Sequence, residues 1–279
     1  MSATVLDGKA LAAKIKEQVA AQAATLPRKP GLAVILVGED PASAVYVRNK
    51  EKDCAECGFL CLDYHLSAET TEQELLTLIA QMNDAPEVDG ILVQLPLPRH
   101  LSEETAIRAI SPEKDVDCFT SENVGCMVQG KPRFLPCTPG GVMALLDEYG
   151  IDPAGKHCVV LGRSNIVGKP MAQLLLQRDA TVTVCHSKTP DLAAECRRAD
   201  ILVSAVGRVG LVTADMVKEG AVVVDVAMNR GADGKLCGDV VYAEVAEKAS
   251  YITPVPGGVG PLTRAQLMAN TLHAAKNRQ

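Results

Sequence analysis

Short runs of Val, Ile and Leu alternate with amphipathic stretches of helical length along the whole chain. A continuous apolar run is typical of a strand that is buried on both faces of a parallel sheet. Because helical stretches follow these runs in alternation, we expect an α/β fold with parallel sheets covered on both faces. The pattern predicts buried strands at about residues 31–38, 59–66, 89–97, 157–162, 181–185, 200–206 and 221–227.

The strands form two series, which predicts two domains. We expect an N-terminal α/β domain over residues 1–137 and a second domain over residues 138–261, with the boundary near "FLPCTPGG" at 134–141. A last helix, at about 262–279, follows a loop rich in Pro and Gly and is expected to pack back on the first domain.

Several helices carry start signals. Thr71 and Glu74 have the spacing of a capping box, in which each side chain bonds the backbone amide of the other residue. A polar residue followed by Pro predicts an N-cap and a first helical residue at three further places: Asp40-Pro41, Thr138-Pro139 and Thr189-Pro190.

Composition narrows the class of protein. The formal net charge is −6 and only 3% of residues are aromatic, with no Trp, which argues against a nucleic-acid or anionic-membrane surface. No stretch approaches the ~20 apolar residues that span a bilayer, and the N-terminus has no signal-peptide pattern. Without an export signal, the 10 cysteines are expected as reduced thiols. We therefore expect a cytoplasmic protein with no membrane and no nucleic-acid partner.

Three cysteines, Cys54, Cys57 and Cys61, form a cluster on and just after one predicted helix. A C-x-x-C motif can be redox-active or can supply half of a metal site, but the chain has no second C-x-x-C motif. We expect structural thiols here and predict no metal site.

The stretch "VVLGRSNIVGKPMAQLLL", residues 159–176, has the order strand, tight turn, helix. Gly162 and Gly168 bracket the turn and would let the backbone approach a phosphate at the helix N-terminus. Ser164 occupies the place of the middle glycine of G-x-G-x-x-G, and the spacing is one residue longer. A Rossmann-like nucleotide-binding turn is favoured over a glycine-bounded connection that binds nothing.

The next strand ends in "CHSKT", residues 185–189, where an NAD-dependent enzyme usually carries a carboxylate for the ribose 2′-hydroxyl. Instead, Ser187, Lys188 and Arg163 offer hydrogen-bond donors and positive charge, which suit a 2′-phosphate. NADP is therefore favoured over NAD. The alternative for Arg163 and Lys188 is that both are solvated surface charges.

Polar residues gather near predicted strand ends in the first half of the chain. Tyr46 and Lys50 share one face of a helix, and Gln94 stands at the end of an apolar run. Asp115 and Asp117 lie in the polar loop that follows. Each residue alone is typical of packing, capping or solvation. Because ligands of open α/β sheets bind at the carboxyl ends of strands, their joint placement favours a substrate cleft.

Two further observations bear on that cleft. A Tyr-x-x-x-Lys pair also occurs in short-chain dehydrogenases, but there it lies downstream of the glycine-rich turn, so the order in this chain disfavours that family. The segment "TPVPGGVGPLT", residues 253–263, carries Gly or Pro at six of eleven positions. Its glycines would allow a flat ligand to approach the backbone.

The motifs "YVRNK", "VQLPLP", "DVDCF", "PCTPGG", "GRSNIVGKP", "GDVV" and "YITPVPGGVGPLT" together resemble those of the bifunctional methylenetetrahydrofolate dehydrogenase/methenyltetrahydrofolate cyclohydrolase family, in family order over nearly the whole chain. The resemblance implies an N-terminal catalytic domain, a Rossmann-like NADP-binding domain, a folate cleft between them and a homodimer. It also implies oxidation of 5,10-methylenetetrahydrofolate by NADP⁺, followed by hydrolysis of the methenyl product to 10-formyltetrahydrofolate.

The same resemblance implies roles for individual residues. Lys50 would be the proton carrier of the hydrolysis, because a desolvated lysine beside a cationic substrate can act as a neutral base. Tyr46 would pack against the folate, Gln94 would hydrogen-bond Lys50, and Asp117 would accept bonds from the pterin. The remaining substrate-binding residues would be Leu95, Pro256, Gly257 and Gly258. The cofactor-binding residues would be Thr138, Gly162, Arg163, Ser164, Val167, Gly168, Ser187 and Ala227.

Three residues depart from the usual family pattern: Cys118 and Ala227, where Gly is common, and Arg264, where a small apolar residue is usual. None removes a proposed catalytic group, although cofactor affinity and pocket shape could differ. Three alternatives stay open at this point: a monofunctional dehydrogenase for the same folate, a shikimate-type dehydrogenase, and an NADP-binding sensor without chemistry. Retention of Tyr46 and Lys50 argues against the sensor.

Overall fold

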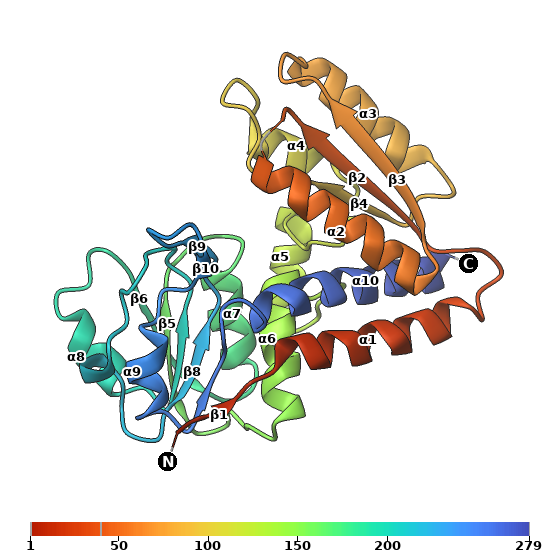
Figure 1. Cartoon of the computed structure of the whole chain (residues 1–279). Helices are drawn as coiled ribbons and strands as arrows, with labels where there is room; N and C mark the ends of the chain where they lie inside the picture. Colours follow the sequence, from red (N-terminus) through yellow and green to blue (C-terminus); the bar gives the residue numbers. More distant parts are fainter. Residues whose placement is uncertain (1, 40, 279) are drawn as a thin grey trace. The chain divides into compact units, whose positions relative to one another are not determined.

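The structure is a computed structural model that describes residues 2–39 and 41–278, without the side chains of residues 41–46. The chain divides into two units, each with its own parallel sheet. The six-stranded unit comprises Met1–Ala12 with Thr138–Thr263, and the three-stranded unit comprises Ala13–Cys137 with Arg264–Gln279. Figure 1 shows the elements of both units in sequence colours.

The three-stranded unit is built on the order β3 (Leu60–Leu66), β2 (Gly31–Val37) and β4 (Gly90–Val93), all parallel. Every residue of the central strand β2 is buried. Alternate residues of β2 point to opposite faces, and helices cover each face, as is typical of a parallel sheet. Leu32, Val34 and Leu36 belong to one core cluster, and Ala33, Ile35 and Val37 to another.

Helices from distant parts of the sequence cover these two faces. On the first face pack residues of α1 (Gly8–Ala23), α2 (Pro41–Cys57) and α10 (Val259–Arg278). On the second face pack residues of α3 (Glu72–Asp84) and α4 (Glu103–Ala109) (Figure 1). The helix α5 (Ser121–Val128) belongs to the same unit.

The six-stranded unit has one parallel sheet with helices on both sides (Figure 1). Its strand order is β1 (Thr4–Val5), β11 (Tyr251–Ile252), β8 (Val222–Asp225), β7 (Ile201–Ser204), β5 (His157–Leu161) and β6 (Thr181–Cys185). A short antiparallel hairpin joins β9 (Asn229–Arg230) to β10 (Leu236–Cys237). The helices are α6 (Cys137–Glu148), α7 (Gly168–Leu176), α8 (Leu192–Arg197) and α9 (Tyr242–Ala246), with a 3-10 turn at Ala214–Met216. The predicted α/β fold with parallel sheets is confirmed.

The capping box of α3 is confirmed, but two predicted helix starts are wrong. Thr71 accepts from the backbone of Glu74 while the Glu74 carboxylate accepts from the backbone of Thr71. Helix α6 already begins at Cys137, so Thr138 lies inside its first turn. Helix α8 is capped by Asp191, whose carboxylate accepts from the Ala194 amide at 2.9 Å. The predicted cap Asp40 lies outside the described residues.

Two boundaries differ from expectation. Strand β4 ends at Val93, four residues before the end of the apolar run, because the prolines that follow cannot continue a ladder. The first residues of the chain lie in the six-stranded unit, because β1 pairs with β11. A strand of two residues is too short to leave a periodic signal.

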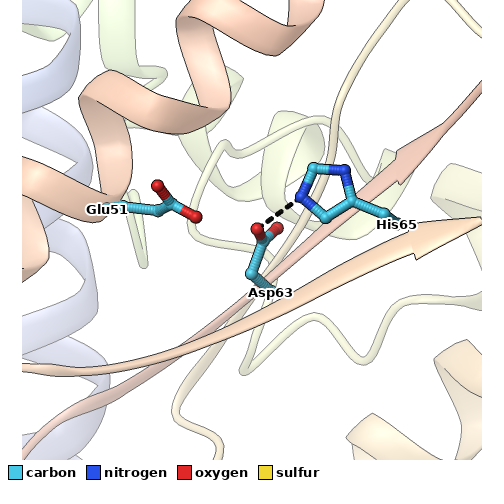
Figure 2. Close-up of side chains that lie close together, drawn as sticks. All are labelled: Glu51, Asp63 and His65. Carbon is cyan, nitrogen blue, oxygen red and sulfur yellow. Dashed lines mark hydrogen bonds and ion pairs between the residues drawn. The ribbon is translucent and has the colours of Figure 1, made fainter. Parts of the chain in front are cut away.

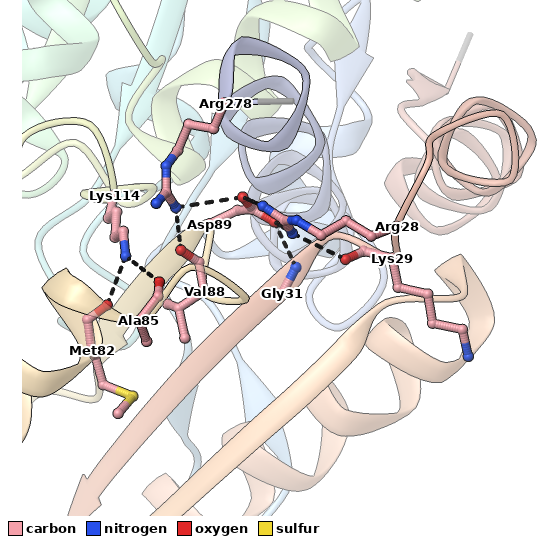
Figure 3. Close-up of polar contacts among 9 residues, drawn as sticks. All are labelled: Arg28, Lys29, Gly31, Met82, Ala85, Val88, Asp89, Lys114 and Arg278. Atoms are coloured by element: carbon pink, nitrogen blue, oxygen red, sulfur yellow. Dashed lines mark hydrogen bonds and ion pairs between the residues drawn. The ribbon is translucent and has the colours of Figure 1, made fainter.

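A buried charge cluster joins the segments before β2 and β4 to the end of α10 (Figure 3). The Asp89 carboxylate, which is fully buried, accepts two bonds of 2.7 Å from the Arg28 guanidinium and one of 2.9 Å from the Gly31 amide. Arg278, near the end of α10, lies 3.5 Å from the same carboxylate. Lys114 donates to the Met82 and Ala85 carbonyls, at the end of α3.

Among the residues that the structure describes, no helix is long and apolar enough to cross a membrane.

Candidate active site and nucleotide turn

Lys50 and Gln94 meet at the carboxyl end of the three-stranded sheet. Lys50 projects from α2 and is 9% exposed, and its Nζ donates to Gln94 Oε1 at 2.8 Å. The backbone amide of Gln94 donates to the Ile35 carbonyl, and its Nε2 donates to the Leu95 carbonyl at 2.6 Å. Because its amide nitrogen is already used, Gln94 presents its oxygen to the lysine.

Burial disfavours the charged forms of both Lys50 and Asp117. Desolvation lowers the pKa of Lys50, and the nearby charge of Asp117 opposes this shift only in part. Desolvation also raises the pKa of Asp117, against the charge of Lys50. The lowered pKa makes the neutral amine, which is the form that accepts a proton, easier to reach than in an exposed lysine.

The two loop aspartates have different surroundings. Asp115 is 1% exposed, and its carboxylate accepts from the backbone amides of Phe119 and Thr120 and from the Asn123 side chain. Both of its oxygens are bonded within this buried loop, so Asp115 fixes the start of α5. Asp117 is half-buried and lies close enough to Lys50 for each charge to shift the pKa of the other.

Two residues that depart from the family pattern have clear structural consequences in this unit. Cys118 has φ 63°, a left-handed conformation that favours glycine. Arg264 forms an ion pair of 2.9 Å with Asp53 on α2, the helix of Lys50. Sequence reasoning missed Asp53, although it lies three residues after Lys50 and therefore on the same helical face. The side chain of Tyr46 lies outside the described residues, so its role stays a prediction.

The glycine-rich turn is tight enough to require both of its glycines. Gly162 has φ 111°, and a Cβ there would lie 2.4 Å from the Ala205 carbonyl oxygen. A Cβ at Gly168 would lie 2.3 Å from the Gly162 carbonyl oxygen. The Ser164 hydroxyl accepts from the Val167 and Gly168 amides, at 3.2 and 3.3 Å, and so occupies the start of α7. The two glycines thus allow the close backbone approach that a phosphate-binding turn before a helix requires, and the Ser164 hydroxyl caps this helix.

Hydrogen-bond donors and positively charged side chains follow the carboxyl ends of β5 and β6, beside the glycine-rich turn. Strands β5 and β6 pair in parallel, with Leu161 opposite Cys185, so the residues that follow them lie at the same edge. Arg163, Ser187 and Lys188 are all exposed there. The segment 185–189 brings no carboxylate to this edge. These residues fit a nucleotide that carries a 2′-phosphate.

Two buried aspartates that sequence reasoning did not single out organise the neighbouring loops. Asp239 is fully buried, and its carboxylate accepts from the amides of Val206 and Arg208 at 2.9 and 2.6 Å. Asp225 accepts from the Ala227 amide at 3.1 Å, and burial raises its pKa to about 6. The motif "GDVV" contains Asp239 and was the available signal, but nothing in the sequence indicates that its carboxylate faces the loop after β7.

The Pro-Gly loop belongs to the six-stranded unit. The Gly258 amide donates to the Pro254 carbonyl at 2.9 Å, and a Cβ at Gly8 would lie 1.9 Å from the Gly258 carbonyl oxygen. Thr138, at the start of α6, is hydrogen-bonded through its hydroxyl to Thr263 at 3.0 Å. Pro256, Gly257 and Gly258 thus lie in one unit while Lys50, Gln94 and Asp117 lie in the other.

A separate group of side chains on α2 and β3 has ligand types suited to a metal ion (Figure 2). Ligand atoms of Glu51, Asp63 and His65 lie within 4.8 Å of one another, and His65 Nε2 lies 2.5 Å from Asp63 Oδ2. The His65 side chain is 59% exposed, and exposed groups of this kind are common without an ion. The cysteines of the nearby cluster are free: Cys54 and Cys57 are buried and Cys61 is half-buried.

Comparisons with known proteins agree with this two-part arrangement. The model of the tetrahydrofolate dehydrogenase/cyclohydrolase catalytic domain matches residues 6–117, and that of the NAD(P)-binding domain of the same family matches residues 136–279. The bifunctional protein FolD of Acidiphilium cryptum is 59% identical over 279 residues, which covers 100% of both chains.

Solved structures give the same result. The bifunctional FolD methylenetetrahydrofolate dehydrogenase/cyclohydrolase of Campylobacter jejuni is 53% identical with a TM-score of 0.98, covering 100% of both chains. The Trypanosoma brucei enzyme, complexed with NADP cofactor and inhibitor, is 42% identical with a TM-score of 0.95, covering 99% of this chain and 98% of that one. The chain therefore belongs to the tetrahydrofolate dehydrogenase/cyclohydrolase family.

Proposed function

We propose that this chain oxidises 5,10-methylenetetrahydrofolate with NADP⁺ and hydrolyses the resulting 5,10-methenyltetrahydrofolate to 10-formyltetrahydrofolate. Family membership supports both activities. The observation that carries the hydrolytic step is the buried Lys50 amine, which is hydrogen-bonded to Gln94 at 2.8 Å and has a lowered pKa.

For the oxidation, the protein has to bind and orient its two ligands. Bound NADP⁺ would supply the acceptor for the hydride that leaves the methylene carbon. The chain's own contribution would be a tight turn for the phosphates, with the Arg163 guanidinium and the Ser187 hydroxyl as donors to the 2′-phosphate. The residues that would hold the cofactor are Thr138, Gly162, Arg163, Ser164, Val167, Gly168, Ser187 and Ala227.

For the hydrolysis, Lys50 would act as the proton carrier. Its neutral amine takes a proton from the water that adds to the cationic methenyl carbon. When a carbon–nitrogen bond of the ring then breaks, this proton goes from Lys50 to the ring nitrogen that leaves, and the remaining hydroxyl proton of the adduct is released to solvent as the formyl carbonyl forms. Gln94 suits this role because its oxygen orients the amine without a negative charge that would hold it protonated.

The remaining substrate contacts follow from chemistry and placement. Asp117 would accept hydrogen bonds from the pterin's amino group and ring N–H, and these donors would favour its ionised form. Tyr46 would pack against the folate. The other residues of the folate site would be Leu95, Pro256, Gly257 and Gly258.

The decisive experiment separates the two activities at Lys50. In Lys50→Met, we expect no hydrolysis of the methenyl compound above the uncatalysed rate, because the proton carrier is gone, with measurable hydride transfer to NADP⁺. Lys52→Met, an exposed lysine on the same helix, is the matched control and should retain both rates. Hydrolysis by Lys50→Met at the wild-type rate would falsify the assignment.

A spectroscopic assay of the wild-type chain distinguishes the rival functions. Methenyl absorbance should form from methylenetetrahydrofolate and NADP⁺ and then decay faster than without enzyme. Formation without enzymatic decay would indicate a monofunctional dehydrogenase. No formation would indicate a binding protein without this chemistry, or another dehydrogenase, which shikimate oxidation would reveal.

We further propose that the protein works as a cytoplasmic homodimer. The resemblance to the family supports the dimer, and the free cysteines are consistent with a reducing compartment. Sedimentation equilibrium tests the dimer, since a monomer mass at micromolar concentration would contradict it, and fractionation of cells tests the location.

A further inference from the structure

Arg264 connects α10 to the turn of α2 that carries Lys50. Its Nη1 lies 2.9 Å from Asp53 Oδ2 and donates to the Asn49 carbonyl at 3.2 Å. Asn49 and Asp53 flank Lys50 on the same helix. The Asp53 carboxylate is 2% exposed, and its other oxygen accepts from Lys16 Nζ at 2.7 Å. A single arginine thus contacts both sides of the lysine's helical turn.

Among the described residues, Gln94 at the end of β4 is hydrogen-bonded to Lys50, and the groups whose charges act on its amine include Asp117 in the following loop, Cys137 at the start of α6, Cys54 on α2 and Arg264 on α10. Of these, Asp117 and Arg264 carry the opposing charges. Asp53 is a buried carboxylate one helical turn away, and Arg264 and Lys16 neutralise it.

We propose that Arg264 is a positioning residue for the hydrolysis: its contacts with Asn49 and Asp53 hold the helical turn of Lys50 in place and set its positive charge near the Lys50 amine. This inference rests on the proposed function of Lys50. The arginine does not touch the reacting atoms. It acts through the helix backbone and through the field at the amine.

The sign of the electrostatic effect follows from the charges. Replacing Arg264 by Met removes a positive charge that lowers the pKa of Lys50, and it leaves Asp53 paired with Lys16 alone. Both changes favour the protonated amine, so the pKa of Lys50 rises. Hydrolysis needs the neutral amine, and the acid limb of its pH profile therefore moves to higher pH. A shift of about one pH unit reduces the rate about tenfold on the acid side.

The test compares the pH profile of methenyl hydrolysis in a set of full-chain variants. Arg264→Met should move the acid limb upward, whereas Arg264→Lys should keep it near the wild-type position, because the charge is retained. The double variant Arg264→Met/Asp53→Asn should return the limb toward its wild-type position, because both charges are removed. Arg198→Met, an exposed arginine paired with Glu195, is the matched control and should leave the profile unchanged.

Two results would overturn the inference. One is an acid limb of Arg264→Met at the wild-type pH, and the other is an equal upward shift in Arg264→Lys and Arg264→Met. If Arg264→Met fails to fold, Arg264→Gln, which also removes the charge but keeps a side-chain amide donor, takes its place and should show the same upward shift. Lys50→Met separates the two proposals. If Lys50→Met hydrolyses the methenyl compound at the wild-type rate, the proposed function of Lys50 is wrong. If Lys50→Met is inactive and the acid limb does not move in Arg264→Met, only the proposed role of Arg264 is wrong.

Discussion

Arg163 lies exposed just beyond β5, at the edge that it shares with Ser187. A charged hydrogen bond to a phosphate contributes about 1.5–3 kcal/mol, so Arg163→Ala should raise the KM for NADP⁺ by about 10- to 100-fold. The KM for NAD⁺, which lacks the 2′-phosphate, should change much less. Lys169→Ala removes another exposed cation near the same turn, one that pairs with Asn165, and serves as the control. Equal effects of Arg163→Ala on the two cofactors would refute the 2′-phosphate assignment.

Cys118 combines a left-handed backbone with a buried side chain. Its φ is 63°, it is 1% exposed, and its thiol donates to the Phe134 carbonyl at 3.3 Å. Cys118→Gly removes about 1 kcal/mol of backbone strain but also loses the buried thiol, so we expect stability within about 1 kcal/mol of wild type. Cys118→Ala keeps the strain and loses the thiol contact, so it should be the less stable variant. Urea unfolding measures both, and an alanine variant as stable as the glycine variant would contradict the strain argument.

At the scale of the element, α3 depends on its N-terminal capping box. Thr71→Ala removes the side chain that accepts from the Glu74 amide, and we expect the free energy of unfolding to fall by about 1 kcal/mol. Thr77, an exposed threonine inside the same helix, is the matched control, because alanine there should be neutral or slightly stabilising. Equal effects at both positions, measured by urea unfolding, would mean that the cap contributes nothing.

The predicted N-caps of the helices differed in how well they matched the structure, because only some of them depend on a local sequence pattern. The Thr71–Glu74 box is a local pattern, since both partners lie within one helical turn, and it formed as predicted. The starts of α6 and α8 could not be read in the same way. Asp191 competes with Thr189 for the cap of α8, and the sequence alone does not decide between two candidates that lie two positions apart.

At the scale of the whole molecule, Asp225 should affect the pH dependence of stability. Burial raises its pKa from 3.8 to about 6 in the folded state, so the unfolded state binds fewer protons between these values. Stability attributable to Asp225 is therefore present below pH 3.8 and is lost as the pH rises through about 6. A pKa difference of this size between the folded and unfolded states corresponds to about 3 kcal/mol.

The variant Asp225→Asn isolates this contribution, because it removes the titrating group while keeping the size of the side chain. Between pH 4 and pH 7, the free energy of unfolding of the wild-type protein should fall by about 2 kcal/mol relative to the variant. Denaturant unfolding across this pH range measures the difference. Parallel curves for the two proteins would show that Asp225 does not titrate with a raised pKa.

The sequence by itself determined the features that depend on local order along the chain. Runs of apolar residues located the long strands and their parallel arrangement, and glycine spacing located the tight turn between Gly162 and Gly168. The absence of a carboxylate in 185–189 is likewise visible without coordinates. These features could be predicted because backbone geometry and burial determine the pattern of apolar, polar and glycine residues over short stretches of sequence.

Only the tertiary structure decided which side chains meet across the fold. It separated Asp115, which fixes the start of α5, from Asp117, which lies beside Lys50. It paired β1 with β11, and Arg264 with Asp53. The physical reason is that these contacts join residues far apart in sequence, whose types are equally compatible with a solvated surface. Only the packing of α2, α10 and the strand ends determines which charges are buried together and can act on the lysine.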